Sequence, residues 1–113
     1  MNSKDACRLM IQAMRTPLLP QDDNLELYQW ILLAQIAVAD NVGLSAGETV
    51  MVDAITMMYN GSPGLDLIQL FLLDSAHVQL VLLCYILTYV SLNDIERPAY
   101  LSRLTDVRFK LGL

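Results

Sequence analysis

The chain has 113 residues, a net charge near −5 at pH 7, 55% hydrophobic residues and only 17% charged ones. This length fits a single domain, residues 1–113, that buries its own core. The excess of acidic side chains argues against nucleic acid and anionic membrane surfaces as partners, because both are bound by clustered Lys and Arg. The high apolar share predicts helices that are largely buried, or an apolar surface shared with a partner such as a second copy.

Two helices are predicted in the first third of the chain. An amphipathic helix over about residues 3–16 begins at Ser3 and ends before Pro17, because proline disfavours the helical conformation in the residue before it. A longer helix ends at Ala39. Its residues 30–39 are apolar on all sides except at Gln35, which predicts a helix covered on every side.

A loop and a third helix follow. Residues 40–44 break the helical pattern, and Gly43 can adopt a positive φ there. Ser45 and Glu48 match the S-x-x-E capping box, in which each side chain accepts a hydrogen bond from the backbone of the other residue. The apolar spacing after Glu48 predicts a helix with one buried face that ends near residue 59.

Three more helices are predicted in the second half. Pro63 is suited to the first turn of a short helix over about residues 63–73. Residues 78–90 are almost entirely apolar and predict a second helix covered on every side. A polar loop at 91–97 precedes a last helix that starts at Pro98 and is capped by Gly112. No strand pattern is visible, so the sequence predicts an all-α protein of about six helices.

The two halves of the chain share one pattern. Residues 36–55 and 88–107 each read as an apolar helix, a polar loop and an amphipathic helix. The prediction is a compact single-domain bundle built from two pseudo-repeated helix-loop-helix units around two apolar central helices.

These motifs resemble the TerB-like domain, a helical family named for tellurite-resistance proteins and similar to the N-terminal region of some membrane-anchored DnaJ co-chaperones. The resemblance covers a core of about residues 25–113. Asn41 stands where the family often has Gly, Arg97 where it often has Ser, and Tyr100 where it has Glu. The matching segments are Ala37-Val-Ala-Asp40, Leu44-Ser-Ala-Gly-Glu48, Tyr89-Val-Ser-Leu-Asn-Asp-Ile-Glu-Arg-Pro-Ala99 and Phe109-Lys-Leu-Gly-Leu113.

The resemblance also implies an acidic cluster that binds a divalent metal ion. The matching residues are Asp40 and Glu48 in the first unit and Asp94 and Glu96 in the second. A hard cation needs several oxygen ligands, and the calcium-loop spacing D-x-D-x-D-G is absent. The alternative is structural: Glu48 completes a capping box, and Asp40 simply lies at a helix end.

No catalytic constellation is visible. His77 is the single histidine, and Cys7 and Cys84 lie in apolar segments, as expected for buried thiols in a reducing cytoplasm. The longest apolar window, residues 78–92, is shorter than the ~20 residues that a membrane-spanning helix needs. The resemblance therefore implies a non-enzymatic cytoplasmic module that binds protein partners in a stress or tellurite-resistance assembly. A small acidic adaptor or secretion chaperone with an exposed apolar surface fits the same size and charge.

Overall fold

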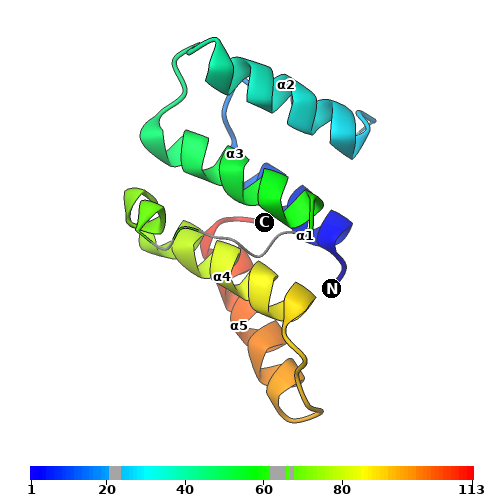
Figure 1. Ribbon diagram of the computed structural model, residues 1–113. Helices are drawn as coiled ribbons and strands as arrows, with labels where there is room; N and C mark the ends of the chain where they lie inside the picture. The colour runs from blue at the N-terminus through cyan, green and yellow to red at the C-terminus, as the bar shows by residue number, and fades with distance from the viewer. Residues whose placement is uncertain (21–23, 62–65, 67) are drawn as a thin grey trace.

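A computed structural model describes residues 1–20, 24–61, 66 and 68–113 of the protein, and these residues contain helices and no strand (Figure 1). The all-α prediction is confirmed. The expected number of helices is wrong, because the described residues form five α-helices and one short 3-10 helix. These are α1 (Ser3–Met14), α2 (Leu27–Ala39), α3 (Ala46–Tyr59), the 3-10 helix η1 (Gln69–Leu72), α4 (Ser75–Tyr89) and α5 (Glu96–Lys110).

The predicted helix over residues 63–73 is the missing sixth α-helix. Its predicted start at Pro63 lies outside the described residues, and among the residues of this segment that are described, the four-residue η1 is the only helical part. The side chain of Asp66 accepts a hydrogen bond from the Ile68 N–H at 3.0 Å, a local turn that competes with helix formation. Leu73 is extended, with ψ at 155°, so the chain leaves the helical conformation before α4.

Capping side chains set the helix boundaries, and one predicted cap is confirmed in full. The Glu48 N–H lies 3.1 Å from Ser45 Oγ, and the Ser45 N–H lies 2.9 Å from Glu48 Oε1. Gly43 and Gly112 adopt positive φ values of 94° and 71°. As predicted, the loop before α3 and the end of α5 both use glycine.

Three predicted starts are displaced by nearby Asn and Asp caps. Asn2, rather than Ser3, caps α1. Asp74 caps α4, which therefore begins at Ser75 instead of residue 78. The last helix starts at Glu96 because Asn93 Oδ1 accepts from the Glu96 N–H at 2.7 Å, so Pro98 falls inside its first turn. Proline is tolerated there, since the first helical N–H groups have no intrahelical acceptor.

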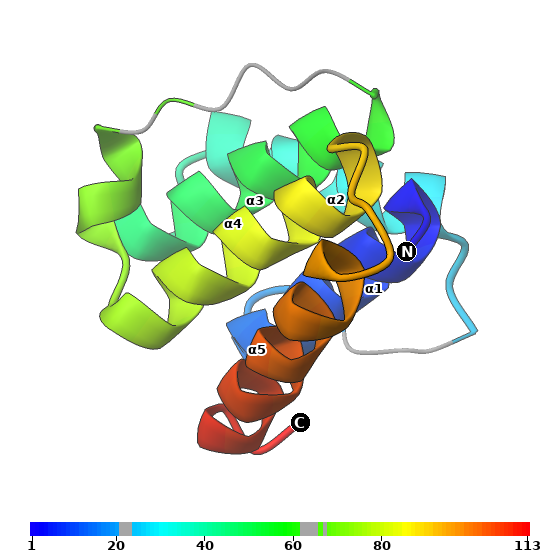
Figure 2. The same cartoon turned by 90° about the horizontal axis from the view of Figure 1, so that it is seen from below.

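The core is organised around α1, which packs against α3, α4 and α2. In Figure 1, α2, α3 and α4 form successive rows, with α1 behind α3 and α5 at the opposite end from α2. Figure 2 shows α5 running obliquely along α4. Ala6, Cys7 and Met10 of α1 have no exposed surface. The N-terminal helix, which precedes the region of family resemblance, thus forms the centre of the bundle.

The prediction of two helices covered on every side is met only in part by α4, where Gln79 and Tyr89 are exposed, and is wrong for α2. Leu80, Val81 and Cys84 of α4 are fully buried, whereas α2 packs on α3 and α1 with one side only. Ala34 and Ala37 lie on that packed side, where small side chains let the helices approach closely. Nothing in the described chain covers the opposite side of α2, so Leu32, Leu33 and Ile36 remain exposed.

Candidate interaction sites

The four predicted metal-binding carboxylates lie at two separate helix-loop-helix junctions. Asp40 is the C-cap of α2 and Glu48 lies in the first turn of α3, whereas Asp94 lies in the loop after α4 and Glu96 is the first residue of α5. The two loops lie at opposite ends of the molecule in both Figure 1 and Figure 2. In the described part of the chain, no three or more His, Cys, Asp or Glu side chains lie close enough to hold a metal ion. The four residues therefore do not fit one common metal centre.

Glu48 and Glu96 each accept a backbone hydrogen bond at the start of a helix. Hydrogen bonds from the Thr16 hydroxyl and the Ser45 backbone lower the pKa of Glu48. Glu96 Oε1 accepts from the Asn93 N–H at 3.4 Å, while Asn93 caps α5. A metal ion would have to compete with these hydrogen bonds. Asp40 is exposed at the end of α2, followed by Asn41 with a φ of 53°.

The single histidine joins two helices. Its backbone N–H donates to the Asp74 carboxylate at 2.9 Å, and ring atom Nδ1 lies 2.8 Å from Asp74 Oδ1. Ring atom Nε2 lies 3.0 Å from the backbone oxygen of Ala13, in the last turn of α1. The backbone and ring hydrogen bonds from His77 lower the pKa of Asp74. Both ring nitrogens of His77 thus take part in a tether between α4 and α1, which gives this Asp-His pair a structural role.

Both thiols are part of the core. Cys7 and Cys84 have no exposed surface, and burial raises the pKa of each to about 12. Because the thiolate is the reactive and metal-binding form, both cysteines have low reactivity at neutral pH. Tyr85 is also buried, and its hydroxyl donates to the backbone oxygen of Ala54 at 3.0 Å.

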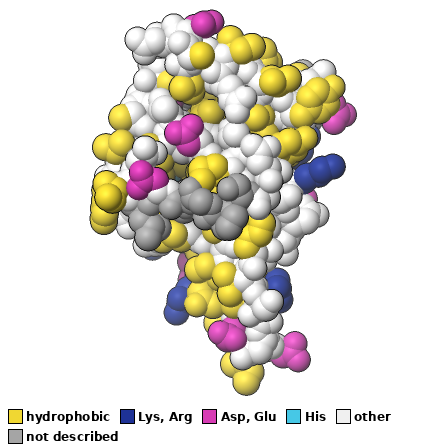
Figure 3. Space-filling view, viewed as in Figure 1, with side chains coloured by type: hydrophobic (Ala, Val, Ile, Leu, Met, Phe, Trp, Pro, Cys, Tyr) yellow, Lys and Arg dark blue, Asp and Glu magenta, His cyan; other side chains and the backbone are white. Residues whose placement is uncertain are grey.

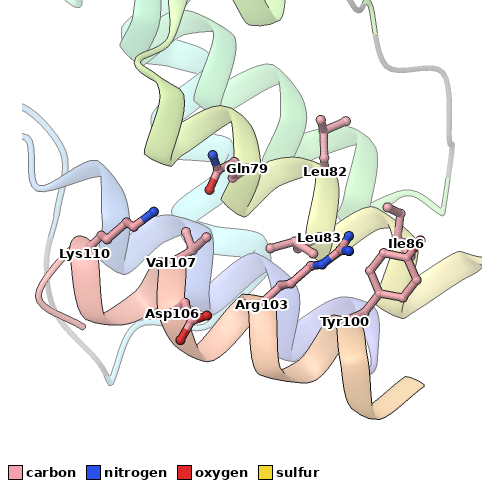
Figure 4. A pocket seen from close by; sticks show the side chains of 9 residues that line it. All are labelled: Gln79, Leu82, Leu83, Ile86, Tyr100, Arg103, Asp106, Val107 and Lys110. Carbon is pink, nitrogen blue, oxygen red and sulfur yellow. The ribbon is translucent and has the colours of Figure 1, made fainter. Parts of the chain in front are cut away.

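A groove with a volume of about 460 Å³ lies between α4 and α5. On the α4 side it is lined by Leu82, Leu83 and Ile86, and on the α5 side by Tyr100, Arg103, Asp106, Val107 and Lys110, with Gln79 near one end (Figure 4). The Arg103 guanidinium carbon lies 5.3 Å from the centre of the Tyr100 ring. Among the described residues, no carboxylate lies within salt-bridge distance of Arg103 or Lys110.

The outer side of α2 carries a run of four exposed apolar side chains. Tyr28, Leu32, Leu33 and Ile36 are 50%, 55%, 45% and 55% exposed. Residues 27–39 contain no charged side chain at all. Hydrophobic side chains gather over α2 along the upper edge of the molecule (Figure 3). We call these four residues the α2 face.

Comparison with known proteins does not assign the chain to a family. No protein-family model matches the chain, and neither a curated protein nor a solved structure gives a significant match. In the described residues, every helix also falls short of the length and apolar content needed to cross a membrane.

Sequence reasoning found neither the groove nor the α2 face. A usable signal for the groove is that Tyr100, Arg103 and Val107 recur at helical spacing, with Lys110 on the same side. The corresponding signal for α2 is that Ala34 and Ala37 fall on one side of the helix, while Leu32, Leu33 and Ile36 fall on the other. A pattern that is apolar on all sides hides this division.

Proposed function

We propose that this chain is a non-enzymatic TerB-like helical module that binds protein partners in a stress or tellurite-resistance assembly. The observation that carries this proposal is the α2 face, on which four large apolar side chains are about half exposed. Exposed apolar clusters of this kind mark interaction surfaces on otherwise soluble proteins. The resemblance of residues 25–113 to the TerB-like pattern is the reason for proposing a stress or tellurite-resistance assembly.

A second copy of the chain is the partner that we assign to the α2 face. Each copy carries a net charge near −5, so two copies repel each other across most of their surfaces. Residues 27–39 are free of charge, and contact there buries apolar surface without pairing like charges directly. An isologous contact between two α2 helices is the simplest arrangement that uses this face.

The test compares self-association of the wild-type chain with that of Leu32→Lys/Ile36→Lys. We expect the wild type to show a mass that rises with protein concentration in sedimentation velocity, and the double variant to remain a monomer, because four lysines would be buried in each dimer. Ile95→Lys is the control, since Ile95 is 84% exposed and lies outside α2.

The result also separates the two candidate functions. A monomeric wild type at all concentrations would contradict the assignment of a second copy to the α2 face. Capture of an exported protein by that monomer, lost in Leu32→Lys/Ile36→Lys and kept in Ile95→Lys, would favour the adaptor or secretion chaperone.

A further inference from the structure

We propose that the groove between α4 and α5 binds an amphipathic helix of another protein, with acidic side chains along one flank. The inference rests on the proposed function as a partner-binding module, and it assigns a partner class to a surface distinct from the α2 face. Three properties of the groove carry it: its charge, its apolar wall and the spacing of its cations.

The charge of α5, which forms one side of the groove, is opposite to that of the chain. Helix α5 carries four of the seven basic residues of the chain and two of its twelve acidic residues. Its net charge is therefore +2, while the remainder of the chain carries −7. Arg103, Asp106 and Lys110 line the groove, so its lining carries a net charge of +1, and in the described chain no carboxylate lies within ion-pair distance of either cation. An acidic partner is attracted to this groove and repelled by the rest of the surface.

The walls of the groove match one face of an amphipathic helix. Leu82, Leu83 and Ile86 of α4 are at the i, i+1 and i+4 spacing of a single helix stripe and provide an apolar wall. Arg103 and Lys110 are seven residues apart on α5, which is about 10 Å along a helix. A helix lying along α5 would meet both cations with acidic residues at i and i+7, while its apolar stripe contacts α4.

The separation of the cations favours an extended partner over a small anion. Figure 4 shows Lys110 beside Gln79 near one end of the groove and Arg103 beside Leu83 and Ile86 farther along, with Val107 between the two cations. A single carboxylate placed at one cation leaves the other unpaired. The volume of the groove nevertheless falls in the range of roughly 300 to 1,000 Å³ typical of small-ligand sites, so an amphiphilic fatty acid is a useful competitor in the test.

A second copy of the chain does not offer a matching helix. Within the described helices, α1 carries one acidic residue, α2 and α4 carry none, and the pairs on α3 and α5 are five and ten residues apart. None of these provides two carboxylates at i and i+7. The occupant is therefore a different protein.

The experiment uses a fluorescent helical peptide of about eighteen residues, with a leucine stripe and with Glu at i and i+7 on one flank. Its counterpart has Lys in place of each Glu. Binding to the full chain is followed by fluorescence anisotropy at low ionic strength and again at about 0.3 M salt. We expect the Glu peptide to bind, its affinity to fall with added salt, and the Lys peptide not to bind.

Variants locate the binding site. We expect Arg103→Glu/Lys110→Glu to weaken binding of the Glu peptide by roughly tenfold or more. Arg97→Glu/Arg108→Glu makes the same change in net charge with residues that do not line the groove, and it should keep most of the affinity. Arg103→Gln/Lys110→Gln, which introduces no new charge, should give an intermediate loss. Circular dichroism verifies that each variant folds.

Several outcomes would overturn the inference. These are absence of binding by the Glu peptide, equal loss of affinity in both Glu double variants, equal binding of the Lys peptide, and saturable binding of decanoate without any binding of the Glu peptide. Sedimentation velocity on the same wild-type sample separates the two proposals. If the chain self-associates through α2 but ignores the Glu peptide, only the groove inference fails.

Discussion

Helices α2 and α4 have nearly the same chemical character but opposite surroundings. Residues 27–39 and 75–89 are both dominated by aliphatic and aromatic side chains, and neither helix contains Lys, Arg, Asp or Glu. Nevertheless α4 lies between α1 and α5, with Leu80, Val81 and Cys84 fully buried, while α2 leaves Leu32 and Ile36 about half exposed. An apolar pattern on all sides of a helix shows that the helix needs cover, but it does not show whether the same chain supplies that cover.

The cause of the difference is the order of the helices in space. Helix α4 has neighbours on two sides, and its polar contacts also reach α1, through His77 Nε2 and the backbone oxygen of Ala13. Helix α2 lies at the edge of the bundle, against α3 and α1. The α2 face is therefore left uncovered by the described part of the chain.

The strongest test of this comparison is one substitution made in both helices. Leu80→Ala in α4 should lower the free energy of unfolding by about 3 kcal/mol, because it leaves a cavity around a side chain with no exposed surface. Leu32→Ala in α2 should lower it by less than about 1 kcal/mol, because this leucine is 55% exposed. Chemical denaturation at a concentration where the chain is monomeric measures both values.

Equal losses at the two positions would contradict the comparison. They would mean that the α2 face is covered within the monomer. If the loss at Leu32 grows as the protein concentration is raised while the loss at Leu80 does not, the extra stability comes from association.

A smaller effect is expected from acid, through the cap of α4. The pKa of Asp74 is lowered in the folded protein by hydrogen bonds from His77. A carboxyl group of this kind contributes its stability above the pKa of the unfolded chain, and that contribution is lost as the pH falls through the folded pKa. Asp74→Asn retains a capping side chain but cannot titrate.

We therefore expect the stability of Asp74→Asn to fall less than that of the wild type between about pH 6 and about pH 3. The difference should be only about a few tenths of a kcal/mol, because Asp74 is largely exposed. Thermal unfolding across this pH range measures the effect, and Glu48→Gln serves as the matched variant for the cap of α3. Identical pH dependence in Asp74→Asn and the wild type would contradict the role of this cap.

The smallest predicted effect concerns the end of α2. Asp40 places a carboxylate at the negative end of the helix dipole, where it is unfavourable. Asp40→Asn should raise the free energy of unfolding by about 0.3 kcal/mol. Titration calorimetry with calcium, magnesium, manganese and zinc should show no difference between this variant and the wild type. Saturable binding that is lost in Asp40→Asn would instead assign a metal-binding role to Asp40.

Local features of the fold were predictable from the sequence. The Ser45–Glu48 capping box and the glycine at residue 112 depend only on residues a few positions apart, and both are confirmed. The predicted helix over 63–73 is not formed in the described part of that segment. There the Asp66 side chain accepts a hydrogen bond from the Ile68 N–H, and Leu73 is extended. The starts of α4 and α5 were displaced because an acid and an amide residue, Asp74 and Asn93, cap them earlier than expected.

The candidate sites were harder to predict because they depend on which helices become neighbours. Glu48 and Glu96 each have a local capping partner, but nothing in the sequence shows that their loops lie at opposite ends of the bundle. The groove appears only when Arg103 and Lys110 of α5 lie beside the apolar wall of α4. Sequence spacing places such residues on one side of a helix without identifying what faces them.

The central position of α1 has a consequence for folding during synthesis. This helix is made before α2 to α5, yet its buried side is completed only when α3 and α4 have been made, and Arg15 at its end donates to the backbone oxygen of Gly112 at 3.0 Å. A growing chain that stops before residue 75 would leave part of the apolar surface of α1 open to water. Ribosome-bound chains of increasing length should therefore become protease-resistant abruptly, after α4 has emerged, rather than helix by helix.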